Sequence, residues 1–122
     1  RDESAQGNIL NYSSPVAYRG RPGTGAYTAI KSAVAGLTMV LAGELGPRGI
    51  RVNAIAPGSV PTPATEGFVT AEQYEQRAKN IPLRRNGTPQ DVARAAAFIL
   101  SDEADFVNGA MLAIDGGIIA AG

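Results

Sequence analysis

The order of its apolar segments restricts the fold of this chain more than any other feature of the sequence. Three short apolar runs, each closed by proline or glycine, alternate with longer segments in which apolar residues recur every three or four positions. Strands separated by helices pair in parallel, and nearly continuous apolar strands are typical of a sheet covered on both faces. The sequence therefore predicts an α/β fold with helices on both sides of a parallel sheet. The expected strands are residues 8–14, 49–58 and 110–115, and the expected helices are residues 27–45, 70–80 and 89–101.

We expect residues 1–122 to form a single unit, because no linker, repeat or low-complexity tract divides them. Three parallel strands make a thin sheet, whose first strand would leave an unpaired apolar edge. The sequence starts without methionine, in a polar segment typical of an internal loop. We therefore expect a fragment of a longer protein, with another segment beside that edge.

The composition excludes several kinds of chemistry. The chain has no histidine and no cysteine, which rules out a Ser-His-Asp triad, a thiol nucleophile, a disulfide framework and the usual zinc sites. Lys and Arg balance Asp and Glu at 11 each, so we expect neither nucleic acid nor an anionic membrane as a partner. No apolar run is long enough to predict a membrane span. The lack of cysteine is compatible with the cytoplasm, where we expect the protein.

A glycine-rich segment, GRPGTGAY at residues 20–27, does not fit a phosphate-binding loop. Such a loop has Lys and Ser or Thr directly after its last glycine, whereas Gly25 is followed by alanine and tyrosine. A dinucleotide fingerprint directly follows a strand, and here Pro15 and two arginines intervene. These are therefore expected to be ordinary loop glycines.

Ser14, Tyr27 and Lys31 are the candidates for chemistry. A free tyrosine phenol titrates at about pH 10, and an ammonium one helical turn away favours its phenolate. A serine at the end of the neighbouring strand could hydrogen-bond a substrate oxygen while the tyrosine moves the proton. The alternative is structural: a packed Tyr27 and a Lys31 whose stem lies along the core. Tyr27 falls inside one apolar stripe and Lys31 lies at its margin, so we expect the pair to share a face that is half sunk toward the core. The stripe is made of Ile30, Val34, Leu37, Leu41 and Leu45.

Four ordered segments together resemble the C-terminal half of the classical short-chain dehydrogenase/reductase family, from about residue 7 to residue 117. The family's Ser–x12–Tyr–x3–Lys pattern falls on Ser14, Tyr27 and Lys31. RVNAIAPGSVPT at residues 51–62 is similar to the family's segment after the next strand. Residues 82–117 are similar to its closing helix, strand and Asp-Gly-Gly. The resemblance implies a Rossmann-like, doubly wound parallel sheet of which the N-terminal half is absent.

The resemblance also implies an activity and a set of site residues. A family member transfers a hydride between NAD or NADP and a carbonyl or alcohol substrate, while the protein moves the proton. Tyr27 would be the general acid/base, Lys31 would assist it and hold the nicotinamide ribose, and Ser14 would orient the substrate. Residues 63–80 would be a mobile substrate lid. The residues lining the nicotinamide would be Pro57, Gly58, Val60 and Thr62.

The sequence leaves three interpretations open. The first is an oxidoreductase whose N-terminal half, with the pyrophosphate loop, lies in the same or another polypeptide. The second is a non-enzymatic fragment that folds or self-associates without binding a cofactor tightly. The third is a general ligand-binding domain of parallel α/β type. The family resemblance further implies a homodimer or tetramer, formed through residues 28–45, residues 89–101 and the last strand, while substrate, cofactor preference and direction are not indicated.

Overall fold

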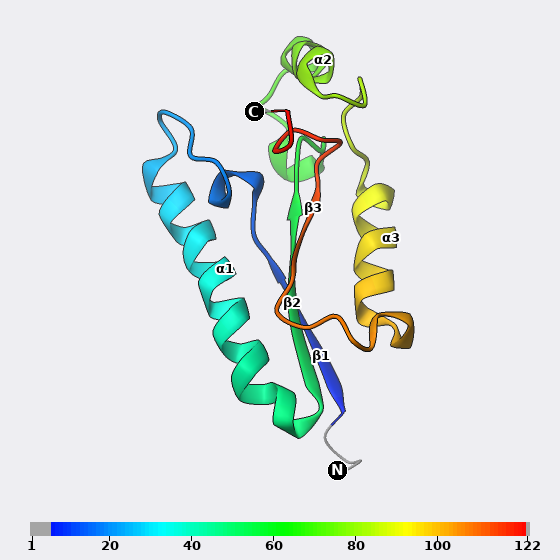
Figure 1. Cartoon of the computed structure of the whole chain (residues 1–122). Helices are drawn as coiled ribbons and strands as arrows, with labels where there is room; N and C mark the ends of the chain where they lie inside the picture. The colour runs from blue at the N-terminus through cyan, green and yellow to red at the C-terminus, as the bar shows by residue number, and fades with distance from the viewer. Residues whose placement is uncertain (1–5, 122) are drawn as a thin grey trace.

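The computed structural model describes residues 6–121 and contains one parallel sheet of three strands (Figure 1). The strands are β1 (Gly7–Tyr12), β2 (Ile50–Pro57) and β3 (Met111–Ile114), in the spatial order β1-β2-β3. Ile55 of β2 pairs with Tyr12 on one side and Leu112 on the other. The predicted parallel α/β fold is thus confirmed.

Helices cover both faces of this sheet. They are α1 (Gly25–Leu45), α2 (Ala71–Asn80) and α3 (Pro89–Leu100). Figure 1 shows α1 and α3 on opposite sides of the strands, and α2 beyond their carboxyl ends. All six predicted elements are present, but β1 ends at Tyr12, two residues before the predicted end, because Ser14 opens a short 3-10 turn over Pro15–Ala17.

The core lies along the central strand. Every residue of β2 from Val52 to Ala56 is buried, and Ile55 and Val52 are the largest fully buried apolar side chains. Burial of a side chain of that size stabilises a fold by about 1.5–3 kcal/mol. The two outer strands are less covered, and the side chain of Tyr12 on β1 is 53% exposed.

The prediction of which face of α1 meets the sheet was only partly right. Val34, Leu41 and Leu45 of the expected apolar stripe are half-buried. Ile30 and Leu37 are 61% and 53% exposed, whereas Thr38 and Ala42, outside the stripe, are buried. The physical reason is close approach: small residues face the sheet, and Asn11 of β1 donates a hydrogen bond of 3.0 Å to the hydroxyl of Thr38. A helix that is apolar on several faces gives no periodicity from which the inner face can be chosen.

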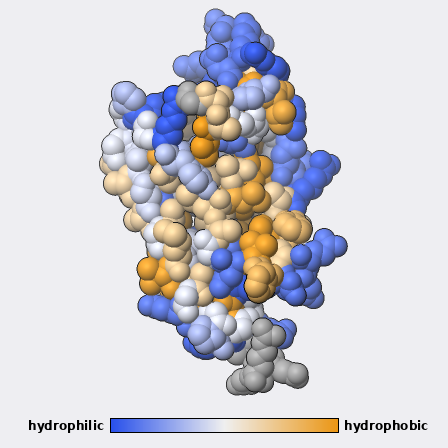
Figure 2. Space-filling model, in the orientation of Figure 1, coloured by the Kyte–Doolittle hydropathy of each residue, from blue (hydrophilic) through white to orange (hydrophobic). Residues whose placement is uncertain are grey.

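The outer face of α1 therefore carries a set of exposed apolar side chains. In Figure 2, apolar residues spread over the face between α1 and α3, while hydrophilic residues gather over α2. By length and hydropathy alone, the helical segment Gly25–Arg48 would suffice to cross a membrane, a test that core helices of water-soluble proteins also pass. The exposed apolar residues of α1 are Tyr27, Ile30, Leu37, Met39 and Val40.

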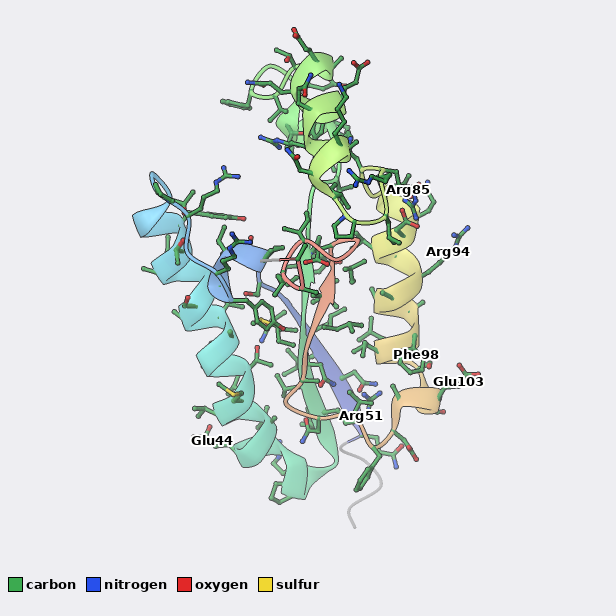
Figure 3. The ribbon with its side chains drawn as sticks, turned by 45° about the horizontal axis from the view of Figure 1, so that its top comes forward. Glu44, Arg51, Arg85, Arg94, Phe98 and Glu103 are labelled. Carbon is green, nitrogen blue, oxygen red and sulfur yellow. The ribbon has the colours of Figure 1, made fainter. Side chains whose placement is uncertain are left out.

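Polar side chains close the amino end of the sheet. The guanidinium of Arg51 donates hydrogen bonds to the carbonyl oxygens of Ile99 (2.9 Å), Ser101 (2.9 Å) and Val107 (3.2 Å), and so holds the end of α3 (Figure 3). Asn53, which is 1% exposed, donates to Val107 and accepts from the N–H of Ala110. The two residues fix the loop through which the chain enters β3.

Candidate functional site

A cleft of about 700 Å³ lies at the carboxyl ends of the strands. Ser14 follows β1, Pro57 and Gly58 end β2, and Tyr27 stands in the first turns of α1; all four line this cleft. In open parallel sheets, ligands bind in the crevice outside the carboxyl ends of the strands. The fold thus brings four of the seven predicted site residues together where such a sheet binds its ligand.

The side chains of Tyr27 and Lys31 are neighbours on α1. The Lys31 ammonium lies 5.8 Å from the centre of the Tyr27 ring, and it donates a hydrogen bond of 2.9 Å to the carbonyl oxygen of Tyr12 at the end of β1. Within residues 6–121 the Tyr27 hydroxyl has no hydrogen-bond partner, and two N–H groups of Lys31 also have none. Tyr27 is 50% exposed and Lys31 is half-buried, close to the half-buried pair that the sequence predicted, and the exposed part of Tyr27 lines the cleft.

Ser13 sets the position of α1 against the strand. Its hydroxyl donates to the carbonyl oxygen of Lys31 at 2.9 Å, and its backbone N–H donates to Ile55 at 2.8 Å. Together with the bond from Lys31 to Tyr12, these contacts fix how far along β1 the helix stands. Sequence reasoning missed Ser13, because the motif spacing selects Ser14 and nothing in the sequence distinguishes the role of its neighbour.

Ser14 is nearly buried and caps the short turn that follows β1. Its Oγ accepts the N–H of Val16 at 3.4 Å, a long hydrogen bond, and the residue is 7% exposed. Its hydroxyl proton has no acceptor in the described part of the chain. Ser14 can therefore both stabilise the turn and donate a hydrogen bond into the cleft.

Gly58 is required by the packing of two strand ends. A Cβ on Gly58 would lie 2.8 Å from Cα and Cβ of Asp115, closer than real side chains approach. Asp115 is itself held in place, since its carboxylate accepts the N–H groups of Gly117 (2.8 Å) and Ile119 (2.9 Å). The close packing accounts for a glycine here whether or not a cofactor binds beside it.

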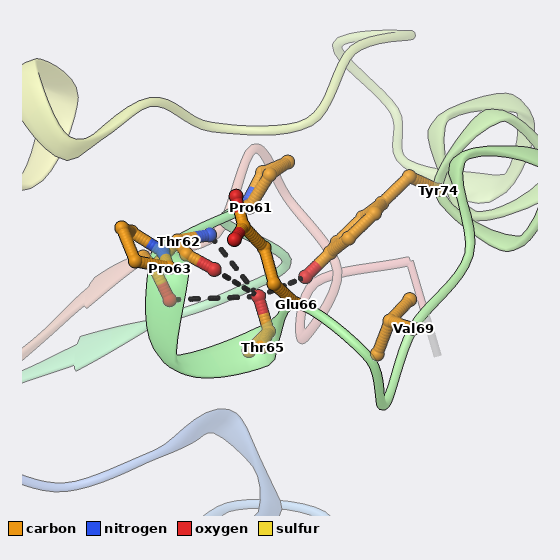
Figure 4. A pocket seen from close by; sticks show the side chains of 7 residues that line it. All are labelled: Pro61, Thr62, Pro63, Thr65, Glu66, Val69 and Tyr74. Atoms are coloured by element: carbon orange, nitrogen blue, oxygen red, sulfur yellow. Dashed lines mark hydrogen bonds between the residues drawn. The ribbon is translucent and has the colours of Figure 1, made fainter.

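Val60 and Thr62 lie apart from the main cleft. Thr62 lines a separate pocket of about 210 Å³ together with Thr65 and Tyr74 (Figure 4). Val60 lines neither cavity, and its side chain packs against Gly87, where an added Cβ would lie 3.0 Å away. The structure therefore does not gather these two residues with Tyr27.

Residues 63–80 are tied to the end of β2 by hydrogen bonds. The Tyr74 hydroxyl donates to Thr65 Oγ1 at 2.8 Å, and Thr65 Oγ1 also accepts the N–H of Thr62 (Figure 4). On the other side, Asn86 donates to the carbonyl oxygen of Tyr74 and accepts from the Ser59 hydroxyl at 2.8 Å. The segment predicted to be a lid is thus anchored at both ends in this conformation.

Three arginines that sequence reasoning missed also line the main cleft. Arg19 and Arg21 come from the loop between β1 and α1, and Arg77 comes from α2. No Asp or Glu among residues 6–121 lines this cleft. The signal for the first two is a basic pair just before Tyr27, in a loop whose glycines are the more prominent feature of the sequence.

Tyr18, the tyrosine nearest to Tyr27 along the chain, is a structural residue. Its hydroxyl donates to the carbonyl oxygen of Met111, and burial together with the nearby Asp115 carboxylate raises its pKa above the usual value. The hydrogen bond to Met111 ties the loop after β1 to the start of β3. Among residues 6–121, no group of three or more His, Cys, Asp or Glu side chains could hold a metal ion.

The fold and the cleft define the class: the carboxyl-terminal part of a Rossmann-type parallel sheet. Residues 3–119 match the family described as Enoyl-(Acyl carrier protein) reductase. The chain is 44% identical over 113 residues to the 3-oxoacyl-[acyl-carrier-protein] reductase FabG of Thermotoga maritima, covering 93% of this chain and 46% of that protein. The chain belongs to the short-chain dehydrogenase/reductase family.

Solved structures agree with this assignment. A 3-ketoacyl-(acyl-carrier-protein) reductase from Brucella melitensis in complex with NADH superposes with a TM-score of 0.84 at 38% identity, over 92% of this chain and 44% of that one. A protein from Agrobacterium tumefaciens described as a 2-deoxy-D-gluconate 3-dehydrogenase, with bound NADP, gives 0.86 at 42% identity, over 94% and 47%. The chain spans about half the length of the relatives that it matches.

Proposed function

We propose that this protein is an NAD- or NADP-dependent oxidoreductase that interconverts a carbonyl and an alcohol, with Tyr27 as general acid/base. The observation that carries the proposal is the meeting of Ser14 and Tyr27 in one cleft at the carboxyl ends of the strands, with the Lys31 ammonium 5.8 Å from the tyrosine ring. Family membership supports the same chemistry.

In the direction of reduction, the protein supplies the proton and the orientation. The Ser14 hydroxyl donates a hydrogen bond to the carbonyl oxygen and holds it near Tyr27. A nicotinamide held beside Lys31, Pro57 and Gly58 would supply the hydride for the carbonyl carbon. The Tyr27 hydroxyl gives its proton to the oxygen as the C–O double bond becomes single, and the Lys31 ammonium stabilises the phenolate that is left. The oxidation runs through the same groups in reverse.

The residues present fit one end of a nicotinamide dinucleotide. Two N–H groups of Lys31 have no partner within residues 6–121 and suit the ribose hydroxyls. Pro57 and Gly58 line the cleft as the nicotinamide would require, and Val60 and Thr62 continue the same segment. One similar solved structure holds NADH and another holds NADP, which supports NAD or NADP as the cofactor of this protein without selecting between the two.

The adenosine end of the cofactor needs residues outside this chain. We propose that an N-terminal half, in the same or another polypeptide, carries the pyrophosphate loop and pairs with β1. The side of β1 away from β2 has no strand partner among the described residues, and Ile9 and Tyr12 are exposed there. We use the term complete protein for this chain together with that half.

Three further proposals rest on the same assignment. Residues 63–80 act as the substrate lid. The exposed apolar side chains of α1, together with α3 and β3, contribute to a dimer or tetramer. The protein acts in the cytoplasm on a small carbonyl or alcohol compound.

The test is Tyr27→Phe in the complete protein. The change removes only the hydroxyl, so we expect turnover to fall by about 10²–10⁴-fold, the usual contribution of a general acid/base, while the Kd for the cofactor stays the same. Intact turnover in this variant would disprove the role of Tyr27.

A second candidate, the non-enzymatic fragment, is tested with the 122-residue chain alone. Because the chain lacks the expected pyrophosphate loop, we expect it to bind NAD(H) and NADP(H) weakly by fluorescence titration. If the purified material contains no N-terminal half by denaturing mass spectrometry and yet binds dinucleotide tightly, the proposed division of the cofactor site is wrong.

A further inference from the structure

The cleft that holds Ser14 and Tyr27 is bordered by three arginines from two separate segments. Arg19 and Arg21 lie in the loop that follows Ser14, and Arg77 lies on α2, within the proposed lid. The side chain of Arg77 is held over the ring of Tyr74, with its guanidinium carbon 5.4 Å from the ring centre. Stacking of this kind orients a guanidinium while leaving its N–H groups free to donate.

These three charges are not neutralised by the chain itself. Within residues 6–121, no carboxylate lines the cleft, and the one ion pair joins Arg85 to Asp91, outside the cleft. None of the three guanidiniums donates a hydrogen bond to another residue in the described part of the chain. A chain with a formal net charge of zero therefore concentrates three positive charges at its candidate site.

Apolar side chains line the same cleft. They are Val16, Ile81, Ile118 and Ile119, and none of them can pair with an ion. A concave site lined by both cationic and apolar side chains attracts anions by its field and holds the uncharged part of a ligand by burial. Guanidinium groups bind carboxylate, sulfonate and phosphate through paired N–H···O bonds.

We propose that the substrate of this site is an anionic carbonyl or alcohol compound, whose carboxylate, sulfonate or phosphate group is held by Arg19, Arg21 and Arg77 while its reacting oxygen faces Tyr27 and Ser14. The inference rests on the proposed reductase function and adds the substrate class to it. The phosphates of the dinucleotide share this chemistry and are the other source of an anion. The substrate is favoured because the arginines belong to the loop after Ser14 and to the proposed lid, and none of them belongs to residues 57–62, the segment expected to line the nicotinamide.

The first experiment compares two probes that differ only in charge, 4-formylbenzoate and its methyl ester. The complete protein is assayed with NADH or NADPH as the hydride donor. We expect kcat/KM for the anion to exceed that for the ester at least tenfold at low salt, and the ratio to fall as salt is added. In the triple variant Arg19→Gln, Arg21→Gln, Arg77→Gln, the ratio should fall close to one.

A matched control uses arginines that are exposed and distant from the cleft. Arg94 points away from the sheet on α3 (Figure 3), and Arg48 lies in the turn before β2. The double variant Arg48→Gln, Arg94→Gln lowers the net charge of the protein without touching the cleft. It should keep the preference for the anion. An equal loss of preference in this control would show a general charge effect and overturn the proposal.

The second experiment reads binding without turnover. Phenylglyoxal labels accessible arginines, and mass spectrometry reports the labelling of the peptides that contain Arg19, Arg21 and Arg77. We expect 4-formylbenzoate to protect these residues at least threefold, and the methyl ester or the dinucleotide alone not to protect them. Protection by the dinucleotide alone would assign the arginines to cofactor binding and overturn the substrate assignment. If neither 4-formylbenzoate, nor its methyl ester, nor the dinucleotide protected these arginines, the substrate assignment would also be overturned.

The two experiments separate this inference from the function on which it rests. In Tyr27→Phe, protection by 4-formylbenzoate should persist even though turnover is lost. Protection without turnover in the unchanged protein would count against the reductase and leave the anion site standing. Turnover of both probes with equal kcat/KM, and without protection, would leave the reductase standing and overturn the anion site.

Discussion

The two ends of the central strand use polar residues in opposite ways. At the amino end, Arg51 and Asn53 direct all of their described hydrogen bonds to backbone groups of the chain. At the carboxyl end, the hydroxyl of Tyr27 and the guanidiniums of the cleft have no hydrogen-bond partner within residues 6–121. Polar groups that are fully paired stabilise a fold, whereas groups left unpaired at a cleft are available to a ligand.

One sequence motif contains both kinds of residue, those that stabilise the fold and those that line the cleft. The segment at residues 51–62 starts with the two residues that fix α3 and the entry to β3, and it continues into Pro57 and Gly58 at the cleft. Its match to a family segment therefore reports structure at one end and a ligand site at the other. The comparison predicts that substitutions at the amino end affect stability and spare chemistry, and that substitutions at the cleft do the opposite.

The largest effect is expected from Lys31→Met at the carboxyl end. The variant keeps the length of the side chain but removes the ammonium beside Tyr27, so kcat should fall by about 10²–10³-fold. The loss of two donors for the ribose should also weaken cofactor binding about tenfold, measured by fluorescence titration of NAD(P)H. Thermal unfolding should change little, because the bond from Lys31 to Tyr12 is exposed.

The control for Lys31 is Arg48→Met, which also removes an exposed positive charge. We expect its kcat and cofactor affinity to match those of the unchanged protein. If Lys31→Met retained both constants, the ammonium would have no part in the reaction, and its contact with Tyr12 would be its only role.

The next effect is expected at the amino end, from Asn53→Leu. The new side chain has a similar volume but removes both hydrogen bonds of a buried amide: the N–H of Ala110 loses its partner, and the carbonyl of Val107 keeps only the longer bond from Arg51, at a cost of about 2–4 kcal/mol. The free energy of unfolding is measured by denaturant titration, and kcat of the folded fraction should stay the same. The same change at exposed Asn8 is the control, where we expect an effect below about 0.5 kcal/mol. A loss of kcat without a loss of stability in Asn53→Leu would contradict the assignment of a structural role to the amino end of β2 and of a catalytic role to its carboxyl end.

Arg51→Met should have a somewhat smaller effect of the same kind. It removes three hydrogen bonds to carbonyl oxygens at the end of α3 and in the following loop, and the cost should be about 1–3 kcal/mol because water can replace part of them. Hydrogen exchange should show faster opening of residues 99–107 than of β2. Arg94→Met, on the exposed face of α3, is the control and should leave both the exchange rates and the stability unchanged. Uniformly faster exchange throughout the chain would contradict a local role for Arg51.

The sequence was sufficient to predict the architecture, for identifiable reasons. Apolar runs bounded by proline and glycine located all three strands, and periodicity together with the spacing of Thr88 and Asp91 located the helices. The convergence of Ser14, Tyr27, Pro57 and Gly58 followed from parallel topology, because the carboxyl ends of parallel strands meet at one edge.

What could not be predicted depends on contacts between distant segments. The inner face of α1 is chosen by Asn11 bonding to Thr38 and by small residues that permit close approach, and neither is visible in a hydropathy pattern. The meeting of Arg77 with the loop of Arg19 depends on where α2 stands above the strand ends. The periodicity of apolar residues describes one helix or strand at a time, whereas each of these contacts joins two segments of the chain.

The smallest effect is expected from the pH dependence of the start of α3. The Arg85 guanidinium, and then the N–H and hydroxyl of Thr88, hold the pKa of Asp91 well below its usual range. A carboxyl group whose pKa is lowered by folding stabilises the fold above its unfolded pKa of about 3.9, and this contribution is lost as the pH falls below that value. The Arg85 and Asp91 side chains are 55% and 24% exposed, so solvent screening keeps the contribution modest.

At pH 7, Asp91→Asn should lower Tm by a few degrees at most, and the difference from the unchanged protein should shrink as the pH is lowered through about 4. Asp102→Asn, a carboxylate with no ion pair among the described residues, should show no such convergence. If the Tm difference for Asp91→Asn were instead the same at low and neutral pH, the charge of Asp91 would not stabilise α3, and its role would be limited to accepting the hydrogen bonds of Thr88.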